Sequence, residues 1–250
     1  MVTRIKTGIP GLDKLMQGGL PQGSINLISG TPGTGKSILC SQIAFDQALK
    51  GKKCLYLNLE QKEGQVEEQM SQFGWDVKKV KKNLTVITID TSDTDVVKYV
   101  LKHIHQANYD LIVLDSLDSI SSNPMSSEEL GEKSLEKIAE FTIPTTMDGE
   151  LIGRLKLKKI FSAIMKTKAT TLLTSEKVEG GEGLSRDTVS EFLCDGIILL
   201  MDTGVAGDKA INISVKKMRL TKIQRGFFPL QISKDGMKII EEEGRDLLMK

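Results

Sequence analysis

One stretch of this sequence limits the possible folds more than any other: residues 24–37, which are SINLISGTPGTGKS. Its first half is rich in apolar and β-branched residues and predicts a buried strand. Residues 30–37 match the pattern G-x-x-x-x-G-K-[ST] in full, and residues 38–45 continue as a helix. A glycine-rich loop between a strand and a helix is the context that separates a phosphate-binding loop from an ordinary flexible turn.

The chemistry of this loop predicts how a nucleoside triphosphate would bind. Its glycines let successive backbone N–H groups turn towards an anion, and the following helix directs its positive end to the same place. Lys36 is placed to reach the β- and γ-phosphates, and the Ser37 hydroxyl is placed to ligate Mg²⁺. With ATP and Mg²⁺ as the expected ligands, the candidate binding residues are Gly30, Thr31, Pro32, Gly33, Thr34, Gly35, Lys36, Ser37 and Ile38.

Length and composition indicate one ordinary globular domain over residues 1–250. Charged residues make up 27% and hydrophobic residues 39% of the chain, which is typical of a domain with a large core. The net charge of +1 argues against an overall basic nucleic-acid-binding surface, although a local basic patch remains compatible with it. No apolar run reaches the roughly 18 residues of a membrane span, and the start lacks a signal-peptide pattern.

The three cysteines, Cys40, Cys54 and Cys194, lie far apart in apolar contexts. This pattern favours reduced thiols in a core over metal ligands or disulfides. We therefore expect a cytoplasmic protein without membrane contact.

Strand and helix patterns alternate through most of the chain. Beyond the loop and a short helix at 12–16, we expect strands at 54–59, 84–89, 111–115 and 170–174, and helices at 36–50, 63–73, 91–107 and 151–168. After a flexible loop at 178–190 the pattern changes to strands joined by turns, at 196–201, 210–218 and 227–232. This order predicts an α/β fold: a central, mostly parallel sheet flanked by helices, with antiparallel strands added near the C-terminus.

Residues 121–150 interrupt the alternation. They begin with a loop, contain a charged helix at about 127–140 and end in an irregular stretch. We expect this insertion to be partly mobile.

Polar residues end several of the predicted parallel strands, which is where open sheets place their sites. Asp115 follows four apolar residues and precedes Ser116, a Walker B pattern whose carboxylate would hold Mg²⁺ beside Ser37. The alternative is a plain turn aspartate, and the presence of the phosphate loop favours the functional interpretation.

Glu60 ends the strand at 54–59, where a carboxylate could orient or deprotonate an attacking water. It could equally be a surface glutamate that opens a helix, and the residues alone do not decide. The hydroxyls of Thr174 and Ser175, next to Glu176, could sense a γ-phosphate or simply end a strand.

Lys217 and Arg219 lie two residues apart near the end of a predicted strand, and at a period of two they point to one face. Such a pair could supply positive charge to a neighbouring subunit's phosphates, as an arginine finger does. The alternative is a surface pair whose stems cover apolar surface.

With these residues assembled, the chain resembles the KaiC-like branch of the RecA/RadA superfamily of ATPases, from about residue 7 to residue 240. Besides the phosphate loop, the resemblance is carried by TGIPGLD at 7–13, GGLP at 18–21, LE at 59–60, FGWD at 73–76, LDS at 114–116 and VKKMR at 215–219. It implies a RecA-like P-loop fold and a hexameric ring with nucleotide between subunits. It also implies that Glu60 is the catalytic carboxylate, acting with Lys36, and that Lys217 and Arg219 reach the nucleotide in trans.

The chain departs from the family pattern at several positions. Gln61 stands where a second glutamate is common, so water activation would depend on Glu60 alone. Leu220 replaces a usual glycine, and the 121–150 segment is longer than expected. The stretch SEFLCD at 190–195 lacks the adjacent Ser-Thr that the clock protein phosphorylates in its second domain, which disfavours autokinase activity.

We therefore expect an ATP-hydrolysing, ring-forming regulator with a further protein partner. One alternative is a RadA-paralogue-like accessory ATPase of recombination or repair that binds single-stranded DNA. Its candidate contacts are Lys156, Lys158, Lys159, Lys166 and Lys168. A second alternative is a nucleotide-bound scaffold or kinase with little turnover.

Overall fold

The computed structural model describes residues 2–92, 95–122, 149–178, 180–181, 183–187, 189–204 and 210–240. Its main feature is a nine-stranded sheet in the order β11-β10-β9-β8-β3-β7-β6-β4-β5. These strands are β3 Ile25–Gly30, β4 Cys54–Asn58, β5 Leu84–Thr88, β6 Leu111–Asp115, β7 Thr170–Glu176, β8 Gly196–Asp202, β9 Ile211–Met218, β10 Phe228–Ser233 and β11 Gly236–Ile239. A separate small sheet pairs β1 Arg4–Ile5 with β2 Leu20–Pro21.

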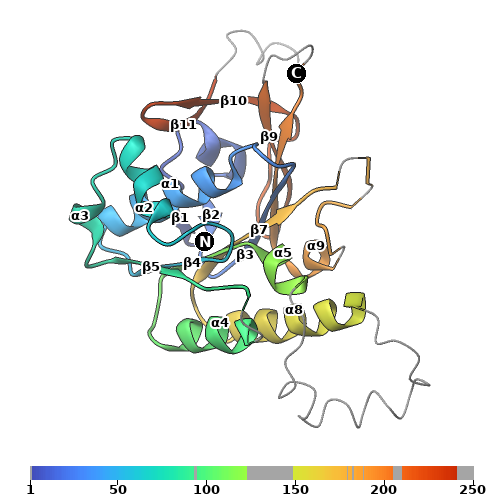
Figure 1. Cartoon of the computed structure of the whole chain (residues 1–250). Helices are drawn as coiled ribbons and strands as arrows, with labels where there is room; N and C mark the ends of the chain where they lie inside the picture. Colours follow the sequence, from blue (N-terminus) through green and yellow to red (C-terminus); the bar gives the residue numbers. More distant parts are fainter. Residues whose placement is uncertain are drawn as a thin grey trace.

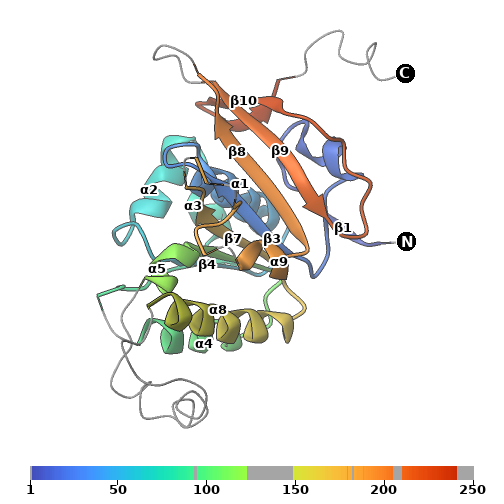
Figure 2. The same cartoon turned by 90° about the vertical axis from the view of Figure 1, so that its right-hand side faces the viewer.

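Helices cover both faces of the large sheet (Figure 1). The described helices are η1 Leu12–Met16, α1 Lys36–Leu49, α2 Gln65–Gln72, α3 Val77–Val80, α4 Val96–His105, α5 Leu117–Ser121, α8 Gly149–Met165 and α9 Ser190–Leu193. Figure 2 shows α1, α2 and α3 on one side of the central strands and α4, α5 and α8 on the other. The expected α/β fold is confirmed.

The apolar strands serve two separate cores, because successive side chains of a strand point to opposite faces. On β4, Cys54 and Tyr56 belong to the core beneath α1, whereas Leu55 and Leu57 belong to the core beneath α4 and α8. All four side chains are fully buried. Burial on both faces explains why these strands are continuous apolar runs in the sequence instead of alternating patterns.

The parallel register brings the carboxyl ends of the central strands to one edge. Gly30 at the end of β3 pairs with Glu176 at the end of β7. Asn58 at the end of β4 pairs with Asp115 at the end of β6. The phosphate-binding loop and the polar strand ends therefore meet at the same edge of the sheet.

The antiparallel strands expected near the C-terminus are present, and the change of direction falls between β8 and β9. β8 does not begin the antiparallel part: it runs parallel to β3, from the pair Asn26–Gly196 to the pair Gly30–Leu200. β7 ends at the carboxyl edge with Glu176 and β8 begins at the amino edge with Gly196, so the two strands run in the same direction. The antiparallel part begins with β9, and β10 and β11 continue it.

The expected flexible loop at 178–190 contains fixed contacts in its described residues. The Ser29 hydroxyl donates a hydrogen bond to the carbonyl of Leu184, whose own N–H donates to Glu191 at 2.7 Å. Six short elements were not predicted from the sequence: β1, β2, β11, α3, α5 and α9. The expected helix at 127–140 lies outside the described residues, as does most of the 121–150 insertion.

Candidate nucleotide-binding site

The loop between β3 and α1 needs glycine at two positions for different reasons. A Cβ on Gly30 would lie 2.5 Å from the carbonyl oxygen of Leu200. Gly35 has a φ of +92°, and a Cβ there would lie 2.3 Å from Cε of Met237. Gly35 also caps α1 without any side-chain hydrogen bond, so the first-turn N–H groups of this helix keep their capacity to bind an anion.

Lys36 lies over the loop that precedes it. Its ammonium donates hydrogen bonds to the carbonyls of Gly30, at 2.9 Å, and Thr31, at 3.1 Å. The Thr34 hydroxyl donates to the same Thr31 carbonyl at 2.8 Å and braces the loop. A phosphate oxygen would replace these carbonyls as a stronger, charge-assisted acceptor for the ammonium.

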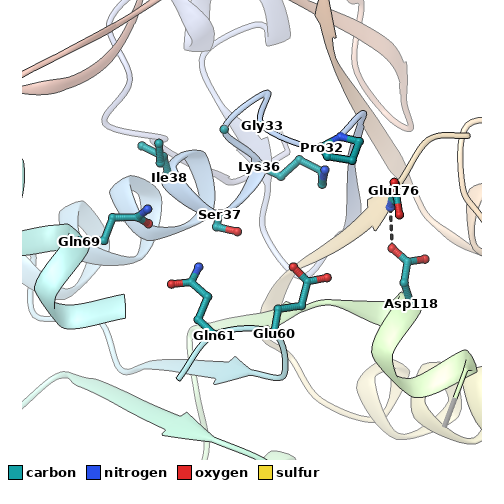
Figure 3. A pocket seen from close by; sticks show the side chains of 11 residues that line it. Pro32, Gly33, Lys36, Ser37, Ile38, Glu60, Gln61, Gln69, Asp118 and Glu176 are labelled. Atoms are coloured by element: carbon teal, nitrogen blue, oxygen red, sulfur yellow. Dashed lines mark hydrogen bonds between the residues drawn. The ribbon is translucent and has the colours of Figure 1, made fainter. Parts of the chain in front are cut away.

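A cavity of about 330 Å³ opens in front of this loop. Its lining residues are Pro32, Gly33, Gly35, Lys36, Ser37, Ile38, Glu60, Gln61, Gln69, Asp118 and Glu176. In Figure 3 the side chains of Glu60 and Gln61 point across the cavity towards the wall that carries Lys36 and Ser37. The structure thus brings Glu60 together with most of the predicted loop residues.

Asn58 fixes the turn that presents Glu60. Its amide oxygen accepts the N–H groups of Glu60, at 3.2 Å, and Gln61, at 2.9 Å, and its amide nitrogen donates to the Gln61 carbonyl at 2.8 Å. The Ser116 hydroxyl donates a hydrogen bond to the Glu60 carboxylate itself. Asn58 was not predicted from the sequence, although an amide within the apolar run at 54–59 was the available signal. The structure shows its side chain fully buried and therefore in need of hydrogen-bond partners.

Asp115 is held by two neighbouring strands. It is only 1% exposed, and its two carboxylate oxygens accept hydrogen bonds from Tyr56, at 2.7 Å, and Thr174, at 2.5 Å. Burial and the negative charge of Asp115 raise the pKa of the Tyr56 phenol well above its usual value, so Tyr56 stays a donor. The orientation of Asp115 at the carboxyl end of β6 is therefore fixed.

Asp118 lines the cavity and was not predicted from the sequence. It is 8% exposed and accepts hydrogen bonds from the Ser175 hydroxyl, at 3.0 Å, and the Glu176 N–H, at 2.6 Å. Burial raises the pKa of Asp118 to about 6, with smaller upward contributions from the charges of Asp187 and Glu60 and opposing contributions from the two hydrogen bonds. Its position three residues after Asp115, in the first turn of α5, was the available signal.

Lys217 and Arg219 do not join this cavity within one chain. Lys217 pairs with Ile197 at the amino end of β8, which is the opposite edge of the sheet from the phosphate loop. Its ammonium donates to the carbonyl of Glu191 at 3.2 Å, and Arg219 pairs with Asp195 at 3.0 Å. Lys217 therefore contacts α9, whereas Arg219, which follows the last residue of β9, contacts Asp195 beyond the end of α9.

Four of the five lysines considered for DNA binding lie on the surface, and one does not. Lys156 is 3% exposed and belongs to the protein interior, whereas Lys158, Lys159, Lys166 and Lys168 are exposed.

Among the described helices, none combines the length and the apolar character that a membrane span requires.

The donor set fits a magnesium ion bound together with a nucleotide. Within the described ranges no three His, Cys, Asp or Glu side chains gather to hold a metal on their own. A magnesium ion at Ser37 would therefore take further ligands from phosphate oxygens and water, as this ion usually does. The uncapped start of α1 and the Lys36 ammonium likewise suit a phosphate chain.

A phosphate loop at the carboxyl edge of a mostly parallel sheet, with carboxylates on the facing wall, defines the class of RecA-like P-loop domains. Comparison with known families shows which family within this class the chain belongs to. The family described as "ATPase: KaiC" matches residues 5–244. The chain belongs to the KaiC family of ATPases.

Two relatives of similar size and one longer protein support this assignment. The chain is 27% identical to a UPF0273 protein of Pyrococcus furiosus, over 97% of this chain and 96% of that protein. It is 30% identical to a UPF0273 protein of Saccharolobus solfataricus, over 94% and 81%. The circadian clock protein KaiC3 of Synechocystis is 27% identical over the whole of this chain, which covers 48% of KaiC3.

The fold has also been seen in a crystal. The structure matches that of a KaiC-like protein from Pyrococcus horikoshii with a TM-score of 0.76 and 26% identity, covering 96% of this chain and 100% of the other. The predicted resemblance to the KaiC-like branch is confirmed.

Proposed function

We propose that this chain binds ATP with Mg²⁺ in the cavity before the phosphate loop and hydrolyses it to ADP and phosphate. The observation that carries the proposal is that Lys36, Ser37 and Glu60 line the same cavity, although they come from two different walls. A triphosphate between these walls would place its terminal phosphate near a carboxylate that can act on water.

Each group has a role that follows from its chemistry and contacts. Lys36 neutralises the β- and γ-phosphates, and Ser37 and Asp115 hold the magnesium ion directly or through water. When bound there, a magnesium ion would supply positive charge to the phosphate oxygens. Glu60, oriented by Ser116 and by the Asn58 turn, positions or deprotonates the attacking water.

We further propose that several copies assemble into a hexameric ring, with Lys217 and Arg219 reaching the nucleotide of a neighbouring copy. Among the described lining residues Lys36 faces three carboxylates, those of Glu60, Asp118 and Glu176. A triphosphate in such surroundings needs more positive charge than Lys36 and one magnesium ion provide. Size measurement by light scattering, with and without ATP and Mg²⁺, tests the assembly.

Phosphate release by the wild type and by Glu60→Gln tests the enzymatic proposal. The substitution keeps the size of the side chain but removes the base, so we expect a loss of about 10²–10⁴-fold in rate with ATP affinity retained. Glu63→Gln, an exposed glutamate in the same turn region, is the matched control. Equal rates for Glu60→Gln and wild type would remove the role of Glu60, and tight ATP binding without release in the wild type would favour a scaffold.

A further inference from the structure

Asp118 connects the end of strand β7 to the helix that follows Asp115. Its two carboxylate oxygens accept from consecutive residues of β7: the Ser175 hydroxyl at 3.0 Å and the Glu176 N–H at 2.6 Å. Ser175 is fully buried and Asp118 nearly so, so these hydrogen bonds have little competition from water. Figure 3 shows Asp118 and Glu176 joined at one side of the cavity.

The next residue of the same strand end contacts the phosphate loop. The N–H of Lys177 donates to the carbonyl of Gly30 at 3.1 Å, and the Lys36 ammonium donates to that same carbonyl at 2.9 Å. Consecutive backbone amides therefore have different partners: Glu176 is bound by Asp118, and Lys177 is bound by the first residue of the loop. A shift of the end of β7 would therefore move the Gly30 carbonyl, which accepts the hydrogen bond from the Lys36 ammonium.

The same strand end also holds the segment that follows it. The N–H of Arg186 donates to the Ser175 hydroxyl at 3.3 Å, and the Arg186 side chain pairs with Glu176 at 3.2 Å. Asp118 thus anchors a unit that includes Ser175, Glu176 and Arg186 against the cavity wall.

We propose that Asp118 is a positioning residue for the γ-phosphate end of the nucleotide site, acting through the amides of Glu176 and Lys177 on Gly30 and Lys36. This inference deepens the proposed function and rests on it. Asp118 acts by keeping hydrogen bonds to the Ser175 hydroxyl and to the Glu176 N–H, and its charge is not required for this. It differs in this respect from Glu60, whose proposed role needs an ionised carboxylate.

The test compares Asp118→Ala with Asp118→Asn. Alanine removes both hydrogen bonds, and we expect the preference for ATP over ADP, measured as the ratio of their dissociation constants by titration calorimetry, to fall about tenfold. Asparagine can keep both contacts, because its oxygen can accept the Glu176 N–H while its NH₂ donates to the Ser175 oxygen. We expect this variant to keep most of the preference.

The matched control is Asp110→Ala at the opposite edge of the sheet. The Asp110 carboxylate also accepts a backbone N–H, that of Lys53 at 2.9 Å, but it lies before β6 and far from the loop. We expect this control to keep the wild-type ATP/ADP ratio. If Asp118→Ala does not fold, Ser175→Ala removes one of the two hydrogen bonds and should shift the ratio in the same direction by a smaller factor.

Two results would overturn the inference. One is an unchanged ATP/ADP ratio in both Asp118→Ala and Ser175→Ala, which would make Asp118 merely structural. The other is an Asp118→Asn variant as defective as Asp118→Ala, which would show that the charge acts directly. The proposed function fails if the wild type neither binds nor hydrolyses ATP. The inference alone fails if the wild type binds and hydrolyses ATP but the Asp118 variants have the same ATP/ADP ratio as Asp110→Ala.

Discussion

The phenol of Tyr56 on β4 donates a hydrogen bond of 2.7 Å to Asp115 at the end of the neighbouring strand β6. Tyr56 is fully buried in the core beneath α1, so its side chain both packs the sheet and reaches the carboxylate proposed to hold magnesium. The Thr174 hydroxyl of β7 binds the other carboxylate oxygen. The orientation of Asp115 therefore depends on strands from both sides.

Tyr56→Phe keeps the ring but leaves one buried carboxylate oxygen without its partner. We expect the free energy of unfolding to fall by about 1–3 kcal/mol, and the Mg²⁺ concentration needed for half-maximal phosphate release to rise about tenfold. Urea unfolding and a Mg²⁺ titration measure the two effects. Thr174→Val should act in the same direction, whereas Tyr109→Phe, which is half-buried and outside the site, is the control that should leave Mg²⁺ dependence unchanged.

Gly35→Ala places a Cβ at a residue with a φ of +92° and against Met237. Gly51→Ala is the matched control, because Gly51 has a φ of +79° and no atom within 4 Å of an added Cβ. Gly51→Ala should cost about 1–2 kcal/mol from backbone strain, and Gly35→Ala about 1–3 kcal/mol more from overpacking. Only Gly35→Ala should weaken ATP binding. Equal unfolding free energies for the two variants would contradict the contact with Met237.

The buried carboxyl of Asp118 gives stability a pH dependence. Its pKa is raised from 3.8 to about 6 in the folded protein, so the folded state favours the protonated form. This contribution to stability is fully present below pH 3.8 and is lost as the pH rises through about 6.

Asp118→Asn removes this dependence because the amide does not titrate. Relative to the wild type, the variant should gain up to about 3 kcal/mol in unfolding free energy between pH 4 and pH 8, measured by urea unfolding across that range. Asp110→Asn, which replaces an exposed carboxylate, should change the unfolding free energy over this pH range by a smaller amount. A constant difference between Asp118→Asn and wild type over the whole range would refute the shifted pKa.

Mixing two inactive variants tests whether sites are shared between copies. Lys36→Ala should abolish tight ATP binding, and Arg219→Ala should abolish hydrolysis while leaving binding largely intact. If Arg219 acts in trans, an equal mixture should recover roughly a quarter of the wild-type rate, because about one interface in four combines intact residues. Arg225→Ala, an exposed arginine, is the control for loss of a surface cation. A mixture without any recovery would speak against the shared site.

The sequence determined the phosphate loop, the parallel α/β fold and the family, because each of these depends on local patterns. A glycine motif between a strand and a helix is recognisable within about 20 residues, and apolar strand runs identify a sheet that is buried on both faces. Glu60 and Asp115 were chosen as candidates because open parallel sheets place their sites at the carboxyl ends of the strands.

The tertiary structure decided which side chains contact one another across strands. The partners of Asp115 are 59 residues away on either side, at Tyr56 and Thr174, and Asp118 meets the Glu176 amide from 58 residues away. The direction of β8 likewise depended on pairing with β3. Strand order and register are long-range properties that no local pattern encodes, and they alone convert separate polar residues into one site.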